Sequence, residues 1–393
     1  MGNAQREKPR RRIRRLRPLK EDLMSTFYMP TRVFAEENAV IRHSGDLASF
    51  GKKALIVTGR HSAFANGSCD DTTSALKDAG IEYVLFSEVE ENPSVTTIMK
   101  ARDFGLANSV DFVIGIGGGS PLDASKAIAL MIAMADKDKS YLYAPDCPGK
   151  TLPIVAIPTT CGTGSEVTAV SVITDRDKMV KKSIAHKIFP ELALIDGRYL
   201  AGAPLSVLSN TAFDALTHLI ESFLNSHASD FSRMCVDAGL RMWAKSLPVL
   251  RKMKTPDAAD FSSMMLASTM AGMAIAHTAT TLPHGLSYAV TTHLNVPHGK
   301  ATAYFTAGYL CEASEEDRDY LLKTAGFSSV DDFRAVYLAS CGTIDAPESA
   351  LKKVLESAVD ELSGNPVKMA LAPFPVDRDV LERIAYYELS HSM

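Results

Sequence analysis

The sequence has few cysteines and no long apolar run. Its six cysteines, at positions 69, 147, 161, 235, 311 and 341, include no Cys-x-x-Cys pair. This pattern indicates a reducing compartment and argues against a disulfide framework or a cysteine-based metal site. No uninterrupted apolar segment is long enough to cross a bilayer, and the chain opens with charged residues instead of the apolar core of a secretion signal. We therefore expect a cytoplasmic protein without a membrane partner.

Charge is unevenly distributed along the chain. The formal net charge is −4, from 42 basic and 46 acidic residues, but residues 1–23 hold nine Lys or Arg against three acids. A basic arm of this kind could bind nucleic acid or anionic lipid. The remainder is acidic and offers no general nucleic-acid footprint. We therefore interpret residues 1–23 as a disordered tail and expect no nucleic-acid partner.

The rest of the chain divides into two parts with different patterns. Residues 24–200 alternate apolar strand-like runs with helical segments, which is typical of an α/β domain with a parallel sheet. We expect strands at 53–58, 83–86, 110–116, 153–157 and 192–195. Residues 201–393 form an all-α domain in this interpretation, with helices near 206–225, 231–253, 257–282, 300–324, 329–340, 348–363 and 376–390. An active site would then lie in the cleft between the domains, where ligands commonly bind.

A glycine-rich loop follows one of the expected strands. Gly117, Gly118 and Gly119 stand directly after the apolar run and before Ser120 and Pro121. Glycine lets the backbone approach a ligand closely, and we expect Ser120 to cap a helix that starts at Pro121. A strand, a glycine turn and a helix N-terminus form an anion site that suits a pyrophosphate. The alternative is a plain strand-to-helix turn, and the spacing matches neither the Gly-x-Gly-x-x-Gly fingerprint nor a P-loop.

Four residues of the second part have side chains that bind metals. Asp214 and His218 are four residues apart, which places both on one face of a helix. His284 and His298 each lie between a Pro and a Gly. One carboxylate and three imidazoles suit a divalent ion such as Fe²⁺ or Zn²⁺. On spacing alone, an Asp-x-x-x-His pair is more often a surface or capping pair.

These blocks together resemble the iron-containing (group III) alcohol dehydrogenases. The resemblance covers about residues 26–393 and rests on the runs 117–126, 157–168, 214–218, 272–284 and 297–299. It implies a Rossmann-like, dehydroquinate-synthase-like first domain, an NAD(P)-dependent alcohol dehydrogenase activity, and at least a homodimer. It assigns the metal to Asp214, His218, His284 and His298. For the nucleotide it implies Gly117, Gly118, Gly119, Ser120, Asp123, Thr159, Thr160, Thr163 and Ser165, with Asp123 near the nicotinamide. Gly59 is a further cofactor candidate, and Lys182 is a candidate for a ribose or phosphate contact, with a solvated surface lysine as the alternative.

One position departs from the family pattern. Many members carry a second histidine four residues after the third metal ligand, and this chain has Tyr288 there. The departure resembles the branch of 1,3-propanediol and butanol dehydrogenases. A proton-relay role for a histidine is then in doubt, and Tyr288 either donates a hydrogen bond in the pocket or only packs.

The end of the first expected strand bears on the choice of nucleotide. Several family members have Asp where this chain has Gly59, and such a carboxylate binds the ribose 2′-hydroxyl and repels a 2′-phosphate. Arg60, His61 and Ser62 follow Gly59 and supply donors. We therefore predict NADP(H) over NAD(H), with Gly59 as a plain turn residue the alternative.

The related folds leave other functions open. Glycerol-dehydrogenase-like enzymes and dehydroquinate-synthase-like lyases share this two-domain plan, and a catalytically silent assembly protein could keep it. A lyase would need basic residues to hold an acidic, phosphorylated substrate, but residues 278–297 contain no Lys or Arg. The sequence therefore favours a small neutral alcohol or aldehyde as substrate.

Overall fold

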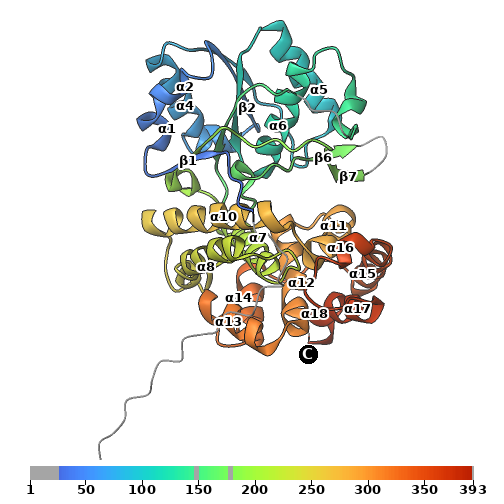
Figure 1. Ribbon diagram of the computed structural model, residues 1–393. Helices are drawn as coiled ribbons and strands as arrows, with labels where there is room; N and C mark the ends of the chain where they lie inside the picture. The colour runs from blue at the N-terminus through green and yellow to red at the C-terminus, as the bar shows by residue number, and fades with distance from the viewer. Residues whose placement is uncertain (1–25, 146–149, 176–179, 392–393) are drawn as a thin grey trace, which may run out of the picture.

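The structure is a computed structural model that describes residues 26–145, 150–175 and 180–391. The predicted basic tail, residues 1–23, lies outside the described residues. An α/β part forms one half of the molecule and a helical part forms the other, and helix α10 (Ala258–Thr278) runs across their junction (Figure 1). Both predicted fold classes are confirmed. Within the described residues no helix combines the length and the apolarity needed to span a bilayer.

The α/β part is built on a sheet of six parallel strands. In spatial order they are β1 (Arg32–Ala35), β8 (Leu192–Ile195), β5 (Ile154–Pro158), β4 (Phe112–Gly117), β2 (Lys53–Thr58) and β3 (Glu82–Phe86). Five of these strands match the predicted segments, namely β2, β3, β4, β5 and β8. The sequence analysis missed β1, a short edge strand, and the hairpin of β6 (Val172–Asp175) and β7 (Val180–Ser183).

Helices cover both faces of the sheet. Leu55 and Val57 pack with α5 (Val95–Ala107) and α6 (Gly119–Ala133). Ala54 and Ile56 point to the other face and pack with α1 (Ala39–Arg42) and α4 (Ser68–Asp78). Successive side chains of a strand point to opposite faces, so a sheet covered on both sides needs a continuous apolar run. The short helices α2 (Ser44–Leu47), α3 (Ser62–Ala65) and η1 (Lys139–Tyr143) complete the connections.

The strand order places a switch point between β2 and β4. From β2 the chain goes to β3 on one side, and then returns to place β4 on the other side of β2. Parallel sheets of this kind bind ligands in the crevice outside the carboxyl ends of the two strands at such a point. Gly59 follows β2, and Gly117 to Gly119 stand at the end of β4. The predicted nucleotide loop therefore lies where this topology offers a site.

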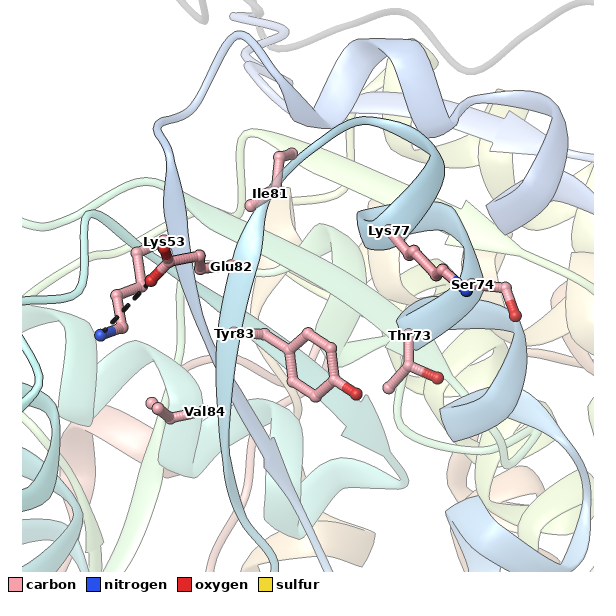
Figure 2. Close-up of a pocket in the computed structure, with 8 residues that line it drawn as sticks. All are labelled: Lys53, Thr73, Ser74, Lys77, Ile81, Glu82, Tyr83 and Val84. Atoms are coloured by element: carbon pink, nitrogen blue, oxygen red, sulfur yellow. Dashed lines mark ion pairs between the residues drawn. The ribbon is translucent and has the colours of Figure 1, made fainter.

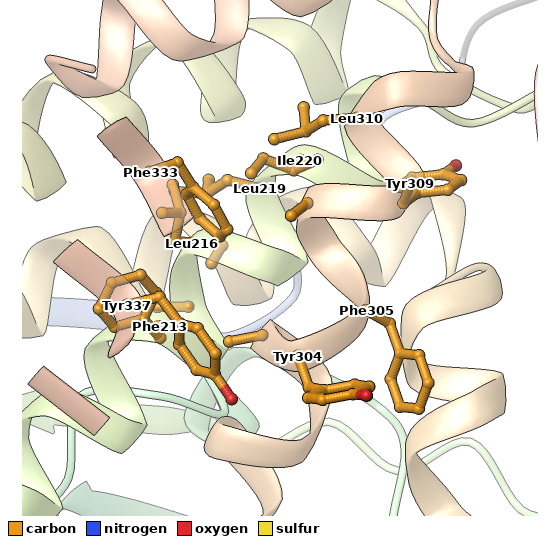
Figure 3. Packing of buried hydrophobic residues seen from close by; sticks show 14 of the residues in the cluster. Phe213, Leu216, Leu219, Ile220, Tyr304, Phe305, Tyr309, Leu310, Phe333 and Tyr337 are labelled. Carbon is orange, nitrogen blue, oxygen red and sulfur yellow. The ribbon is translucent and has the colours of Figure 1, made fainter. Parts of the chain in front are cut away.

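The second part consists of helices around one apolar core. Its elements are α7 (Leu205–Phe223), α8 (Asp230–Ala244), α9 (Leu247–Leu250), α10, α11 (Leu282–Leu294), α12 (His298–Glu312), α13 (Glu315–Ala325), α14 (Val330–Cys341), α15 (Glu348–Ser363), α16 (Pro366–Met369), α17 (Arg378–Ala385) and α18 (Tyr387–Ser390). Phe213 of α7 contacts Phe333 and Tyr337 of α14 edge-on, with ring centroids 5.8 and 5.7 Å apart (Figure 3). Edge-to-face pairs at these distances are favourable beyond their buried area. This core fixes α7 against α12 and α14.

Several predicted helix boundaries were wrong. The segment 231–253 is two helices, α8 and α9, and 300–324 is divided between α12 and α13 by Ser314, whose hydroxyl caps α13. Helix α11 was not predicted at all. Its first turn contains Pro283, and Pro is favoured in the first turn of a helix.

Close backbone contacts connect the two parts. A Cβ atom at Gly164, which has φ of +60°, would lie 2.5 Å from the Cα of Gly272 in α10. The short helices η2 (Ser165–Val167) and η3 (Gly197–Leu200) also pack against α10. Glycine at both positions lets the segment after β5 lie directly on the helical part.

Candidate active site

The glycine loop packs tightly against the segment that follows β5. A Cβ atom at Gly118 would lie 3.0 Å from Thr160 Oγ1, and one at Gly119 would lie 2.8 Å from Thr163 Cγ2. Gly117 has φ of +149°, and a Cβ atom there would lie 2.6 Å from the ring of Pro121. The loop thus needs glycine at each position to bring its backbone this close to the threonines.

Ser120 does not have the predicted capping role. Helix α6 begins at Gly119, and its N-cap residue is Gly118, which makes no side-chain cap hydrogen bond. The hydroxyl of Ser120 instead accepts a hydrogen bond from the backbone N–H of Asn92, at 3.1 Å. The first turn of α6 therefore has no capping side chain, and its N–H groups suit an anion.

Asp123 and Ser165 are joined by a buried network. Ser165 Oγ donates to Asp123 Oδ1 at 2.5 Å, and Val172 N donates to Asp123 Oδ2 at 2.9 Å. Lys126 Nζ, which is fully buried, donates to Ser165 Oγ at 2.7 Å. Burial lowers the pKa of Lys126, and Asp123 and Glu166 oppose this shift. The network holds the segment after β5 against α6, so Ser165 already has protein partners.

The other predicted nucleotide residues differ in their surroundings. Thr159 Oγ1 is buried and has no hydrogen-bond partner among the described residues. A Cβ atom at Gly59 would lie 3.4 Å from the carbonyl oxygen of Val89, so a side chain would just fit there. Arg60 and His61, which follow it, are exposed.

Two adjacent lysines of β7 point to different places. Lys182 Nζ lies 4.2 Å from the centre of the Tyr143 ring. Lys181 Nζ donates to Asn92 Oδ1 at 2.7 Å, and burial lowers its pKa against the opposing charges of Asp123 and Asp214. Lys181 therefore lies between the glycine loop and the helical part, and the sequence analysis missed it. The alternation of side chains along a strand could have found it, since only one of two neighbours can face the cleft.

Three of the four predicted metal ligands converge. Asp214, His284 and His298 each offer a donor atom within 4.8 Å of the other two. They come from the middle of α7, the first turn of α11 and the first residue of α12. A Cβ atom at Gly299 would lie 1.9 Å from the carbonyl oxygen of Asn210, so only glycine lets α12 begin directly on α7.

His218 lies beside this group but not within it. Its ring stacks on that of His284, with centroids 4.4 Å apart, and its Nδ1 lies 3.2 Å from the carbonyl oxygen of Gly162. If Nδ1 carries the proton for that bond, Nε2 has a free lone pair. His218 therefore borders the three converging side chains from the same helix face as Asp214.

Glu221 lies behind His284, and the sequence analysis missed it. The fully buried carboxylate bonds the Nδ1 of His284 through Oε2, and its Oε1 accepts from the backbone N–H groups of Thr281 and His284 at 3.2 and 3.0 Å. A carboxylate on the far nitrogen of a ligand histidine fixes the ring and its tautomer. The signal was a lone acid in an apolar run, three residues after His218 and on the same helix face.

The site combines the buried carboxylates of Asp214 and Glu221 with three histidines. Burial would raise the pKa of Asp214, but His218, His284 and His298 together hold it well below its usual range. Burial lowers the pKa of His298 to about 3. Burial would also lower the pKa of His284, but Glu221 and Asp214 outweigh it and raise the value to about 9. His284 Nε2 and His298 Nδ1 are buried and have no hydrogen-bond partner among the described residues, although His284 Nε2 lies 3.6 Å from Asp214 Oδ1. A carboxylate and orphaned imidazole nitrogens at these distances fit a divalent metal ion.

Tyr288 faces the metal ligands from the next turn of α11. Its ring is nearly parallel to that of His298, with centroids 6.1 Å apart and an angle of 8°. Burial raises the pKa of Tyr288 to about 12, with Glu221 and Asp214 contributing. The hydroxyl group therefore stays protonated at neutral pH and can act as a hydrogen-bond donor.

A surface hollow of about 430 Å³ lies elsewhere, between α4 and the edge strand β3 (Figure 2). It is lined by Lys53, Thr73, Ser74, Lys77, Ile81, Glu82, Tyr83 and Val84. Lys53 and Glu82 are the first residues of β2 and β3, whereas the glycine loop is at the carboxyl ends of the strands. The hollow is therefore separate from the candidate active site.

Comparison with known proteins places the chain in a family. The family model for iron-containing alcohol dehydrogenase matches residues 30–197, and that for the C-terminal part of the same family matches residues 208–326. The chain is 33% identical to the probable alcohol dehydrogenase EutG of Escherichia coli over 281 residues, 71% of each protein. It is 33% identical to the NADPH-dependent butanol dehydrogenase of Clostridium saccharobutylicum over 260 residues, 65% of this chain and 66% of that one.

Longer relatives and solved structures extend the comparison. The chain is 31% identical to the bifunctional aldehyde-alcohol dehydrogenase AdhE of Escherichia coli over 264 residues, and this match spans only 30% of that protein. The iron-containing alcohol dehydrogenase structure from Thermotoga maritima superposes with a TM-score of 0.83 at 33% identity, covering 93% of this chain and 99% of the other. The resemblance predicted from the motifs is confirmed, and the chain belongs to the iron-containing alcohol dehydrogenase family.

Proposed function

We propose that the protein is a metal-dependent oxidoreductase that transfers hydride between a small neutral alcohol or aldehyde and NAD(P)(H). The observation that carries this proposal is the convergence of Asp214, His284 and His298 between helices, beside Lys181 and the glycine loop. The family is named for the iron it contains, so Fe²⁺ is the first candidate for the ion. Zn²⁺ is a second candidate because the same ligands accept it.

Each group of residues has a separate task in this mechanism. The ion, when bound, acts as a Lewis acid on the oxygen of the alcohol or aldehyde. Asp214, His284 and His298 would hold it, with His218 as a fourth ligand from the adjoining turn. Glu221 keeps the Nε2 of His284 directed at the metal position. The first turn of α6 and Lys181 would bind the cofactor phosphates, while Tyr288 supplies a neutral donor near the reacting oxygen.

The metal proposal is tested by the variant His284→Ala. We expect it to lose bound metal and turnover together, because His284 is one of the three converging donors and the ion would keep only Asp214, His298 and the adjoining His218. Metal content is measured by elemental analysis after loading with Fe²⁺ under anaerobic conditions, and turnover by the absorbance of NADPH with butanal. His186→Gln is the control, since that buried histidine bonds the carbonyl of Tyr141, within the α/β part. Full turnover by metal-free His284→Ala protein would refute the proposal.

We further propose that NADP(H) is preferred to NAD(H). Gly59 leaves the end of β2 without a carboxylate that would repel a 2′-phosphate, and the exposed Arg60 and His61 follow it. A relative named for its dependence on NADPH supports the same choice. The comparison of kcat/KM with NADPH and NADH tests the proposal, and equal or higher efficiency with NADH would contradict it.

The oxidoreductase and the related lyases are separated by the same assay. The residues 278–297 around the ligands carry no Lys or Arg to hold an acidic substrate. We therefore expect net oxidation of NADPH with a small aldehyde such as butanal. A lyase would convert its substrate with no net change in the NADPH absorbance, and a silent assembly protein would show no turnover at all.

A further inference from the structure

The turn between α10 and α11 contains an alanine in a strained conformation. Ala279 has φ of 61° and ψ of 175°, a region that is populated almost only by glycine. The residue is exposed, so its methyl group gains little from packing that could offset the strain. Residues in such conformations persist only where their surroundings hold them.

Asn225 holds this turn from the end of α7. Its Nδ2 donates to the carbonyl oxygens of Thr278 and Ala279, at 3.0 and 3.2 Å. Its Oδ1 accepts from the backbone N–H of His227 at 2.9 Å, which fixes the orientation of the amide. The buried side chain of Asn225 therefore bonds the strained residue itself and the residue before it.

Lys368 and Glu221 bind the next groups of the same turn. Lys368 of α16 donates through Nζ to the carbonyl oxygen and the hydroxyl of Thr280, at 2.5 and 2.9 Å. Glu221 accepts from the N–H groups of Thr281 and His284. The backbone carbonyls of three successive residues and the N–H groups of Thr281 and His284 are thus bound by the side chains of Asn225, Lys368 and Glu221. Only Ala279 to Thr281 separate α10 from α11, so the conformation of this turn sets the direction of the α11 helix.

We propose that Asn225 and Lys368 are positioning residues that hold the strained turn and thereby aim His284 at the metal. The inference rests on the metal site proposed above. Helix α11 starts at Leu282, and its first turn carries His284. Relaxation of Ala279 toward an ordinary conformation would reorient that turn and move the His284 imidazole away from Asp214 and His298. The hydrogen bonds of Asn225 and Lys368 therefore maintain the strained conformation of Ala279, and this conformation fixes the position of His284.

The test uses metal affinity and a rescue by glycine. Metal-free wild-type protein and the variants Asn225→Ala, Ala279→Gly and Asn225→Ala/Ala279→Gly are titrated calorimetrically with Zn²⁺. We expect Asn225→Ala to bind Zn²⁺ about tenfold more weakly, the size of effect known for residues that orient ligands. Glycine adopts the required conformation without strain, so the double variant should recover most of that loss. Ala279→Gly alone should bind Zn²⁺ as the wild type does and melt at a higher temperature.

A matched control separates positioning from general stability. Asn66 makes bonds of the same two kinds but lies in the α/β part. Its Nδ2 donates to the carbonyl oxygen of Tyr199, and its Oδ1 accepts from the N–H of Ser68, two residues later. Asn66→Ala should leave the Zn²⁺ affinity unchanged. If Asn225→Ala does not fold, Lys368→Met with and without Ala279→Gly gives the same comparison. Unchanged Zn²⁺ affinity in Asn225→Ala and Lys368→Met would overturn this inference and leave the metal site standing. The same holds if Ala279→Gly restores none of the lost Zn²⁺ affinity. Failure of the wild type to bind Zn²⁺ or Fe²⁺ would overturn the metal site and the inference with it.

Discussion

The proposed nucleotide loop and the proposed metal site lie side by side but are assembled differently. The loop and its threonine partners follow two neighbouring strands, β4 and β5, which pair in parallel register. The metal ligands come from three helices, and 84 residues separate Asp214 from His298. Adjacent parallel strands bring their carboxyl ends together by their hydrogen bonds alone. Helices have no such register, so the metal ligands meet only through packing, which Gly299 permits and Glu221 directs.

The difference implies that substitutions can damage the nucleotide loop and the metal site separately. We call these two groups of residues the half-sites. Removal of a group behind the histidines should weaken metal binding and leave nucleotide binding intact. Distortion of the loop after β4 should do the reverse. A residue at the seam between them should change the rate of the reaction more than either affinity. The three substitutions below address these cases, from the largest expected effect to the smallest.

Glu221→Gln should have the largest effect. Burial would raise the pKa of Glu221, but His284 lowers it, so the group is an anion in the native site. Glutamine keeps the shape but removes the charge and replaces one acceptor atom with a donor. It therefore cannot accept at one atom from the Nδ1–H of His284 and at the other from the N–H groups at the start of α11. We expect the affinity for Zn²⁺ to fall by roughly 10- to 100-fold, with the affinity for NADPH unchanged, both measured by titration.

Glu166→Gln is the control for this substitution. Glu166 is also a buried acid, but it accepts from Thr269 Oγ1 at 2.8 Å and does not contact the metal ligands. Its variant should bind Zn²⁺ as the wild type does. If Glu221→Gln weakened nucleotide binding as much as metal binding, the two half-sites would not be separable.

Gly117→Ala should have the opposite selectivity. The φ of +149° and the contact with the ring of Pro121 both oppose a side chain at this position. The loop must shift, and a strain of about 1–3 kcal/mol corresponds to roughly 5- to 150-fold in affinity. We expect NADPH to bind more weakly by about tenfold, near the lower end of this range, with Zn²⁺ affinity unchanged.

Gly67→Ala provides the matched change outside the site. Gly67 has φ of +80°, but a Cβ atom there would meet no atom within 4 Å. Gly67→Ala therefore has the conformational strain of a positive φ but no steric contact of the kind that Pro121 makes in Gly117→Ala. It should lower the melting temperature and leave NADPH binding unaltered. Equal nucleotide affinities in the two variants would mean that the loop does not approach the cofactor.

The sequence was more informative about the nucleotide half than about the metal half. The strands β2, β3, β4, β5 and β8 were predicted because a buried parallel sheet requires contiguous apolar runs, and Gly117 to Gly119 stand at the end of one of them. In the helical part, Pro283 and Gly285 concealed α11, because the carboxylate that caps this helix comes from Glu221, 60 residues earlier. A pattern within a segment cannot reveal a cap supplied by another helix.

The same limit explains the individual residues that were missed. Lys181 and Lys182 cannot be told apart until β7 exists as a strand, since the pleat alone decides which of them faces Asn92. Ser120 could not cap α6 once Gly118 took the capping position. The strain at Ala279 has no signal in composition, because nothing about an alanine indicates a conformation typical of glycine. The assembly of distant helices determines each of these features.

Tyr288→Phe should have the smallest effect and tests the seam between the half-sites. The tyrosine ring packs beside His298, and its hydroxyl has no hydrogen bond within the described part of the chain. Phenylalanine preserves the packing and removes only the donor. A hydrogen bond to the substrate oxygen is worth about 1 kcal/mol, so we expect kcat to fall about fivefold while the affinities for Zn²⁺ and NADPH stay the same. Tyr304→Phe is the control, because that hydroxyl is buried without a hydrogen-bond partner among the residues that the structure describes, and its charged neighbours are Glu388 and Arg334 instead of the proposed metal ligands. An unchanged kcat in Tyr288→Phe would show that the ring only packs, and a loss of metal affinity would assign the residue to the metal half instead of the seam.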